Sequence, residues 1–245
     1  MKLIRKAKLL PDALSGYDRS DPFRNGEYKF LRTYLKSNMI VFDVGANIGE
    51  YAQYILSINP NVRIFCFEPV FNTYAHLKIN LSKEINSGKL VVNNFGLSDT
   101  KSESDIFIYD DLSGNNSLYF NEIYGVSDKT LRKEKILLKT LNEYTDLNNI
   151  NKIEYLKIDV EGHESKVLFG ATNLISKKSI SCIQFEYNSN WKVSGAKLGE
   201  VFEFLLPFGY KFYRLTIWGK IPVKRFKVGL ENYKHSNYIA LLDGE

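Results

Sequence analysis

The chain has 245 residues, of which 44% are hydrophobic and 25% charged, and its net charge at pH 7 is +5. These values are typical of a globular protein with one sizeable core, and they exclude a wholly disordered chain. Two cysteines are too few for a disulfide-stapled secreted scaffold, and no apolar run is long enough for a transmembrane helix. The basic start at 1–6 is not followed by an apolar stretch, so we expect no signal peptide and a cytoplasmic protein with a single domain over 1–245.

Positive charge is concentrated near the two ends of the chain. The first ten residues carry four basic residues and no acid, and 211–234 carries seven basic residues with Glu231 as its one acid. Such a field attracts anionic ligands or lipid headgroups, although a solvated basic surface is the simpler interpretation. No motif of a nucleic-acid-binding module accompanies the charge. We therefore expect no nucleic acid partner and, at most, peripheral membrane contact.

Short apolar, β-branched runs alternate with amphipathic segments along most of the chain. Before them, 1–38 is expected to be an N-terminal helical or irregular extension. The alternation predicts a mostly parallel sheet with helices on both faces. The predicted strands are 40–44, 63–67, 90–93, 155–159 and 181–185, and the predicted helices are about 51–58, 71–85, 167–175 and 198–205.

The spacing of these strands predicts an insertion. The interval between the third and fourth strands is more than twice as long as its neighbours, so an insertion must occupy 100–145. Alternating apolar residues at 105–109 and 135–139 indicate extra β structure around a turn at 114–116. Loops on a rigid scaffold commonly carry specificity, so we expect this insertion to face the acceptor of any reaction.

The C-terminal part of the chain departs from the alternation. The segments 210–215 and 237–242 have strand patterns, but 218–236 between them has no helical pattern. A parallel crossover normally needs a covering helix. The sequence therefore predicts that the last strand is antiparallel.

The loop after the first strand has the composition of a cofactor-binding turn. Small residues in DVGANIG at 43–49 allow backbone N–H groups and a helix N-terminus to approach a ligand closely. Its G-x-x-x-G spacing differs from the G-x-G-x-x-G that suits a pyrophosphate, which favours an adenosine ligand without one. Glu68 ends the next strand, where a carboxylate can accept hydrogen bonds from both ribose hydroxyls. Taken singly, the glycines can be simple turns and Glu68 a surface acid.

Four motifs in order resemble the FkbM-type methyltransferases: DVGANIG at 43–49, FEP at 67–69, GLSD at 96–99 and LKIDVEGHE at 156–164. The resemblance runs from Val41 to Glu186 and is specific to the family, not to a substrate. It implies the Rossmann-like class I methyltransferase fold, with a seven-stranded sheet whose last strand is antiparallel, and S-adenosylmethionine as cofactor. The implied reaction is O-methylation of a sugar hydroxyl in a bacterial glycan or related metabolite.

The resemblance also implies which residues hold the cofactor, from its methionine end to its adenine. These are Asp43, Gly45, Ala46, Asn47 and Gly49 for the methionine end, Glu68 for the ribose, Pro69 and Val70 beside the purine, Phe95 and Gly96 at the adenine, and Asp159. Phe95 is bulky where the family often has a small residue.

Three ionisable residues gather after the predicted fourth strand: Asp159, Glu161 and His163. Ligands of open α/β sheets bind outside the carboxyl ends of the strands, so these residues are candidates for catalysis. Methyl transfer to an alcohol needs a base for the hydroxyl proton, and such assistance is worth about 10²–10⁴-fold. His163 suits this role because its unperturbed pKa is about 6.5, while Asp159 or Glu161 can orient it, position the acceptor or act as the base. The alternative is a structural role, in which these groups only cap the following helix or complement the positive charge of its N-terminus.

The end of the fifth strand supplies the expected acceptor wall, formed by Glu186, Asn188 and Trp191. The expected partner is a small-molecule or glycan acceptor, which can carry a phosphate, a nucleotide or a lipid phosphate. We expect no metal, although the O/N ligands near Asp159 make a divalent cation an alternative. Two other functions stay open: an NAD-dependent Rossmann oxidoreductase and a non-catalytic cofactor-binding module.

Overall fold

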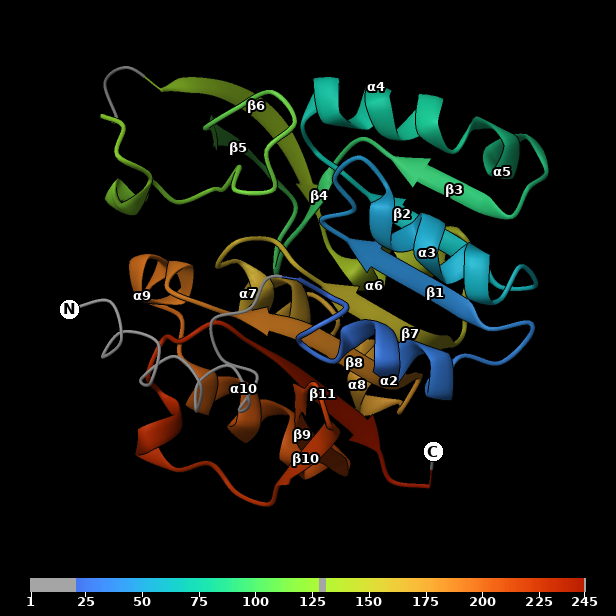
Figure 1. Cartoon of the computed structure of the whole chain (residues 1–245), viewed down its shortest axis with the longest axis vertical. Coiled ribbons are helices and arrows are strands. Elements are labelled where there is room, and N and C mark those ends of the chain that lie inside the picture. Colours follow the sequence, from blue (N-terminus) through green and yellow to red (C-terminus); the bar gives the residue numbers. More distant parts are fainter. Residues whose placement is uncertain (1–20, 128–130, 245) are drawn as a thin grey trace, which may run out of the picture.

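The computed structural model describes residues 21–127 and 131–244 (Figure 1). The basic residues of the first ten positions, and the first half of the extension predicted over 1–38, lie outside these ranges. The described part of that extension contains helix α2 (Glu27–Tyr34). Within the described ranges, no helix has both the length and the apolar character needed to cross a bilayer.

A central sheet of eight strands has the order β10-β9-β11-β8-β7-β1-β2-β3. Neighbouring strands from β8 to β3 are parallel, whereas β11 is antiparallel to both β8 and β9. The predicted antiparallel last strand is therefore confirmed. The strands are β1 (Ile40–Val44), β2 (Arg63–Phe67), β3 (Leu90–Asn93), β7 (Ile153–Ile158), β8 (Ile180–Tyr187), β9 (Tyr210–Thr216), β10 (Gly219–Val223) and β11 (Ser236–Leu242).

Strand β10 adds an eighth strand to the seven that were predicted. It forms an antiparallel hairpin with β9 at the edge of the sheet. Pro222 cannot donate a ladder hydrogen bond, so a strand that contains it is tolerated at an edge and gives a weak sequence signal.

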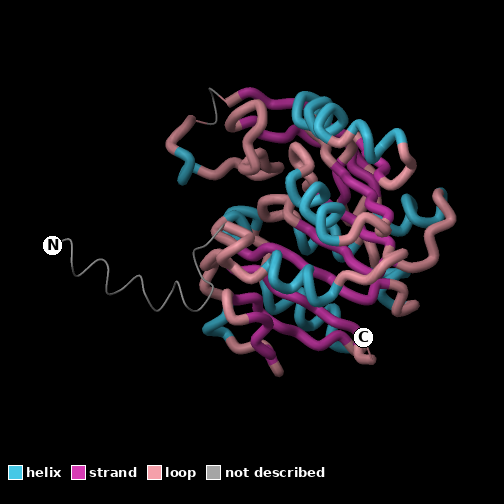
Figure 2. Tube along the Cα trace, turned by 45° about the vertical axis from the view of Figure 1, so that its right-hand side comes forward, coloured by secondary structure: helices cyan, strands magenta, loops and turns pink. Residues whose placement is uncertain are grey.

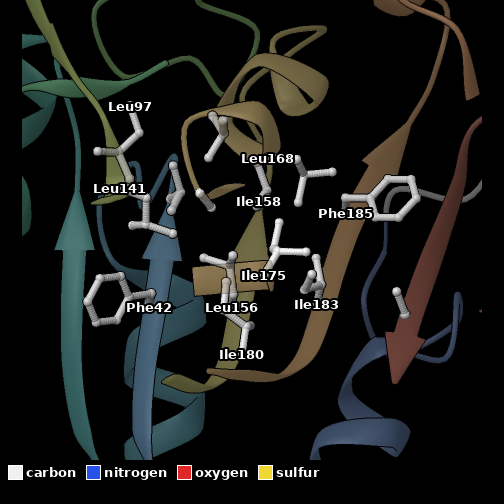
Figure 3. Close-up of a cluster of buried hydrophobic side chains, with 14 of the residues drawn as sticks. Phe42, Leu97, Leu141, Leu156, Ile158, Leu168, Ile175, Ile180, Ile183 and Phe185 are labelled. Atoms are coloured by element: carbon white, nitrogen blue, oxygen red, sulfur yellow. The ribbon is translucent and has the colours of Figure 1, made fainter. Parts of the chain in front are cut away.

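Helices cover both faces of the central sheet, as predicted (Figures 1 and 2). One face packs Phe42, Leu156 and Ile183 in one cluster with Leu168 of α7 (Figure 3), and residues of α10 belong to the same cluster. The other face packs Val41, Ile64 and Tyr155 against α2 and α3. The predicted helices 71–85 and 167–175 are each divided into two. The helices are α3 (Glu50–Ile58), α4 (Phe71–Asn80), α5 (Ser82–Asn86), α6 (Leu141–Leu147), α7 (Glu164–Phe169), α8 (Thr172–Ser176), α9 (Asn190–Ser194) and α10 (Leu198–Leu205).

The insertion forms a second, three-stranded sheet, which confirms the predicted β structure between the third and fourth strands. Its order is β4 (Gly96–Leu97), β6 (Arg132–Lys139), β5 (Ser102–Ile108). Strand β6 lies beside α4 (Figure 1), and Phe71 N donates to the Glu134 carboxylate at 2.9 Å. The segment between β5 and β6 folds back over the carboxyl edge of the central sheet, where the candidate site lies.

Candidate active site

A cavity of about 310 Å³ lies at the carboxyl edge of β1, β2, β7 and β8. The loops after these strands line one side of it with Gly45, Glu68 and Asp159, and β8 contributes Glu186. The insertion lines the other side with the segment 113–118. The residues predicted from separate strand ends therefore meet around one cavity, and the insertion faces it.

Gly45 allows the loop after β1 to pass directly against the end of β7. Its φ is 81°, and an added Cβ would lie 1.8 Å from the carbonyl oxygen of Asp159. A side chain cannot be accommodated there without moving backbone. This close approach keeps the Gly45–Asn47 loop and Asp159 on the same cavity wall.

Glu68 joins the loops after β1 and β2. One of its carboxylate oxygens accepts a hydrogen bond from Asn47 N at 3.0 Å, and the other accepts one from Val70 N at 2.9 Å. Burial raises the pKa of Glu68 to about 7, and the two backbone hydrogen bonds only partly offset this effect. Because each carboxylate oxygen has a second lone pair, Glu68 can still accept hydrogen bonds from a ligand.

An apolar wall from the insertion encloses the end of the cavity near Pro69. Ile106 on β5 and Ile136 and Leu138 on β6 pack with Val70, and all four lie beside the cavity. Gly96 lies against this wall, and an added Cβ would lie 2.7 Å from Leu138 Cδ2, so the Leu138 side chain would have to shift to accommodate it. The apolar character of this wall suits an aromatic base. Val70 was predicted beside the purine, but sequence reasoning missed Ile106, Ile136 and Leu138 as site residues, although their alternation along two predicted strands was a usable signal.

The opposite end of the cavity is acidic. Asp159, Glu161 and Glu186 each offer a carboxylate oxygen, and these oxygens lie within 4.8 Å of one another. Lys157 Nζ donates to Asp159 at 2.8 Å, and Glu186 pairs with His235. No lysine or arginine is among the described residues that line the cavity.

These three carboxyl groups have different proton affinities. Burial alone would raise the pKa of Asp159, but the Lys157 ammonium holds that pKa below its ordinary value. Burial and the neighbouring Glu186 and Asp159 carboxylates raise the pKa of Glu161 well above its ordinary value. Glu161 has a left-handed φ of 52°, a conformation that concentrates at functional sites in non-glycine residues. Its carboxylate accepts hydrogen bonds from the side-chain amides of Asn188 and Asn190.

His163 also borders the cavity, but both of its ring nitrogens have partners. Ser98 Oγ lies 2.9 Å from Nε2, and the Tyr119 hydroxyl lies 2.8 Å from Nδ1. Ser98 donates its own proton to Asp99, so Nε2 donates to Ser98 and Nδ1 accepts from Tyr119. Burial lowers the pKa of His163 to about 4. A neutral His163 thus connects Ser98, just after β4, to Tyr119 in the segment between β5 and β6. Its predicted role as the base stays a prediction that these contacts do not favour.

Several predicted site residues lie away from the cavity. Trp191 is fully buried in the core, where its indole N–H donates to Glu186 O, so it does not form part of the acceptor wall. Phe95 packs against Phe67 and Tyr144 instead of lining the cavity. Ala46 is buried in the core below the loop.

Asp43 and Gly49 support the cavity from below. Asp43 is fully buried and neighbours Lys157 in the sheet, and within the described part of the chain neither of its carboxylate oxygens has a hydrogen-bond partner. Burial raises its pKa to about 6. Gly49 is the N-cap of α3, and an added Cβ there would meet Leu77 and Leu81. Neither residue is among the cavity-lining residues.

We expect His163 to position the insertion, since His163 lines the cavity and hydrogen-bonds Tyr119 in the segment between β5 and β6. Tyr119→Phe and His163→Ala should each raise the KM for the acceptor by roughly tenfold, the effect of losing one buried hydrogen bond, with a smaller change in kcat. Steady-state kinetics over acceptor concentration measure both constants. If His163→Ala instead lowered kcat more than about 100-fold while Tyr119→Phe did not, His163 would be the base.

Chelation tests whether the acidic end of the cavity holds a metal. Turnover should survive dialysis against EDTA, because Lys157, His235 and the two asparagine amides already satisfy the three carboxylates. Turnover would be assayed before and after dialysis, with Mg²⁺, Mn²⁺ or Ca²⁺ added back singly. A loss that one of these cations restores would contradict the prediction.

The fold and the cavity at the carboxyl edge define a Rossmann-like methyltransferase fold. A solved FkbM methyltransferase from Methylobacillus flagellatus superposes with a TM-score of 0.54 at 15% identity, covering 84% of this chain and 45% of that chain. A family model described as the methyltransferase FkbM domain matches residues 43–212. The chain belongs to the FkbM methyltransferase family.

Three curated relatives show how far this similarity extends. Hexuronic acid methyltransferase AglP of Haloferax volcanii is 29% identical over 164 residues, which cover 65% of this chain and 62% of AglP. Methyltransferase sdnD of Sordaria araneosa is 26% identical over 186 residues, 66% of this chain and 70% of sdnD. AMB antimetabolite synthetase AmbE of Pseudomonas aeruginosa is 30% identical over 166 residues, 56% of this chain but 8% of AmbE.

Proposed function

We propose that this protein is an S-adenosylmethionine-dependent O-methyltransferase whose acceptor is a sugar hydroxyl. The observation that carries the proposal is one cavity with Glu68 and an apolar wall at one end and three carboxyl groups at the other. Membership of the FkbM family supports methyl transfer. That membership and the antiparallel β11 leave the oxidoreductase alternative without support.

The residues that line the cavity suit S-adenosylmethionine. Glu68 suits the two ribose hydroxyls, and Val70, Ile136 and Leu138 suit the adenine. Asp159 would offer its carboxylate to the amino group and sulfonium of the methionine end, and no lysine or arginine that would repel them is among the described residues lining the cavity. When bound, the cofactor would supply an activated methyl group with a good leaving group.

A carboxylate at the acidic end of the cavity can take the proton of the acceptor hydroxyl. An alcohol loses its proton as the new bond forms, and a base whose pKa lies near the working pH is most effective. Glu161 meets this condition better than Asp159, because its pKa is raised whereas that of Asp159 is lowered by Lys157. We therefore assign the base role to Glu161, with Asp159 holding the cofactor and acceptor in line.

The surroundings of Glu161 suit a neutral polyol. Asn188 and Asn190 donate hydrogen bonds to Glu161 from their side-chain amides, and the Asn190 amide also donates to the Tyr124 hydroxyl at 3.2 Å. With no cation among the described lining residues, a phosphate or lipid phosphate on the acceptor would lie outside the cavity. The similarity to AglP, named as a hexuronic acid methyltransferase, supports a sugar as the acceptor.

The proposal is tested by incubating the protein with methyl-labelled S-adenosylmethionine and a panel of glycan precursors, read by mass spectrometry. We expect one methyl group on a sugar oxygen of at least one precursor. Binding of the cofactor without transfer to any precursor would favour the non-catalytic module. Transfer to nitrogen would contradict the O-methyltransferase assignment.

A further inference from the structure

The free edge of the central sheet carries a groove that the proposed reaction does not use. It has a volume of about 470 Å³ and lies between β10 and the segment that follows it. Its lining includes four cationic residues and an apolar floor: Arg214, Lys224, Arg225, Lys227, Ile221 and Leu230. This groove, together with the exposed Trp218 and Val228, is called the β10 surface below.

Three of the four cationic residues that line the groove lack an acidic partner within the described ranges. Lys224, Arg225 and Lys227 are exposed, and none of them forms an ion pair within the described part of the chain. The one acid of this stretch, Glu231, is turned inward. Its carboxylate accepts hydrogen bonds from Leu198 N and Gly199 N at the start of α10.

The same surface exposes large apolar side chains. Trp218 is 71% exposed in the turn between β9 and β10, Val228 is 83% exposed and Ile221 is 45% exposed. A lysine or proline on an edge strand protects it from pairing with other strands, which accounts for Pro222. Edge protection does not account for an exposed tryptophan just before β10 and three exposed cations beyond its other end. An indole and cationic side chains along one edge are a combination typical of the membrane interface.

The position of Trp218 relates this surface to the cavity. Strand β9 is antiparallel to β11, which is antiparallel to β8, so β9 runs in the same direction as β8. The turn after β9 therefore lies at the same edge of the sheet as the cavity. If Trp218 contacts a surface, this edge of the sheet, and the cavity with it, would therefore face that surface.

We propose that the β10 surface docks on an anionic phospholipid bilayer, with Trp218 in the headgroup region and Lys224, Arg225 and Lys227 against the lipid phosphates. Charge complementarity selects an anionic surface. The exposed indole and aliphatic side chains favour a bilayer over an acidic protein or a soluble polyanion, because only the bilayer offers an apolar layer directly beneath its charge. An acceptor attached to lipid would then meet the cavity at that surface.

Tryptophan fluorescence gives a direct readout. The chain has two tryptophans, and Trp191 is fully buried while Trp218 is exposed. The full chain would be titrated, in 150 mM salt, with vesicles of phosphatidylcholine alone or with added phosphatidylglycerol, and binding would be measured by co-sedimentation. We expect binding and a blue shift only with phosphatidylglycerol, and Trp218→Phe should abolish the shift.

Two charge-reversal variants separate local docking from net charge. Lys224→Glu/Arg225→Glu/Lys227→Glu should weaken vesicle binding at least about tenfold. The matched control, Lys78→Glu/Lys83→Glu/Lys89→Glu, changes the charge equally near the β3 edge on the far side of the sheet. S-adenosylhomocysteine binding reports that each variant is folded. Equal loss in both variants, no binding to either vesicle, or equally tight binding to polyglutamate without a fluorescence shift would overturn the proposal.

Discussion

Glu161→Gln is expected to lower kcat by about 10²–10⁴-fold, the value of general-base assistance, while the Kd for S-adenosylhomocysteine stays nearly unchanged. Glutamine keeps the size of the side chain and an acceptor for Asn188, but it cannot take a proton. Because burial and neighbouring carboxylates raise the pKa of Glu161, wild-type kcat should rise with pH as Glu161 ionises. The variant should lose this rise.

Single-turnover kinetics with saturating cofactor measure the chemical step in this comparison. Glu122→Gln is the matched control, since Glu122 is exposed on the insertion and touches none of the three carboxyl groups. The control should have wild-type turnover. If Glu161→Gln kept a wild-type rate and pH profile, Glu161 would not be the base.

Glu68→Ala is expected to raise the Kd for S-adenosylhomocysteine by about 100-fold or more. Two hydrogen bonds from ribose hydroxyls to a charged acceptor contribute about 1.5–3 kcal/mol each, and the variant also frees Asn47 N and Val70 N from their common partner. Isothermal titration calorimetry gives the Kd. Glu103→Ala, on the exposed part of β5, is the control and should bind as the wild type does.

The same carboxyl group predicts how cofactor affinity depends on pH. The pKa of Glu68 in the free protein is raised to about 7, and the ionised carboxylate is the better acceptor for ribose hydroxyls. Binding therefore favours the deprotonated form, and the Kd should fall between pH 6 and pH 8. Glu68→Gln should remove most of this slope. An affinity that weakens as pH rises through 7 would contradict the assignment of Glu68 to the ribose.

The sequence was sufficient to predict those residues of the site whose positions depend on where a strand ends. Gly45, Glu68, Asp159 and Glu186 follow or end parallel strands, and the carboxyl ends of parallel strands share one edge. Their meeting around one cavity followed from the βαβ rhythm alone. The antiparallel β11 was likewise predictable, because the segment before it lacks a helical pattern.

The remaining features depend on contacts between distant residues. His163 has its partners 65 residues earlier at Ser98 and 44 residues earlier at Tyr119, and no local pattern reports such pairing. Trp191 turns into the core because Phe185 and Tyr187 pack against it, whereas its position after a strand equally suits a cavity wall. Within a strand, successive side chains point alternately to the two faces of the sheet, but beyond the end of the strand this rule no longer tells which way a side chain points.

Calorimetric titration of the full chain with S-adenosylhomocysteine, and separately with NAD⁺, tests most directly whether the cavity holds a sulfonium nucleoside. We predict saturable binding of one S-adenosylhomocysteine per chain and no saturable binding of NAD⁺. The absence of saturable S-adenosylhomocysteine binding, or tighter binding of NAD⁺, would contradict the proposed function.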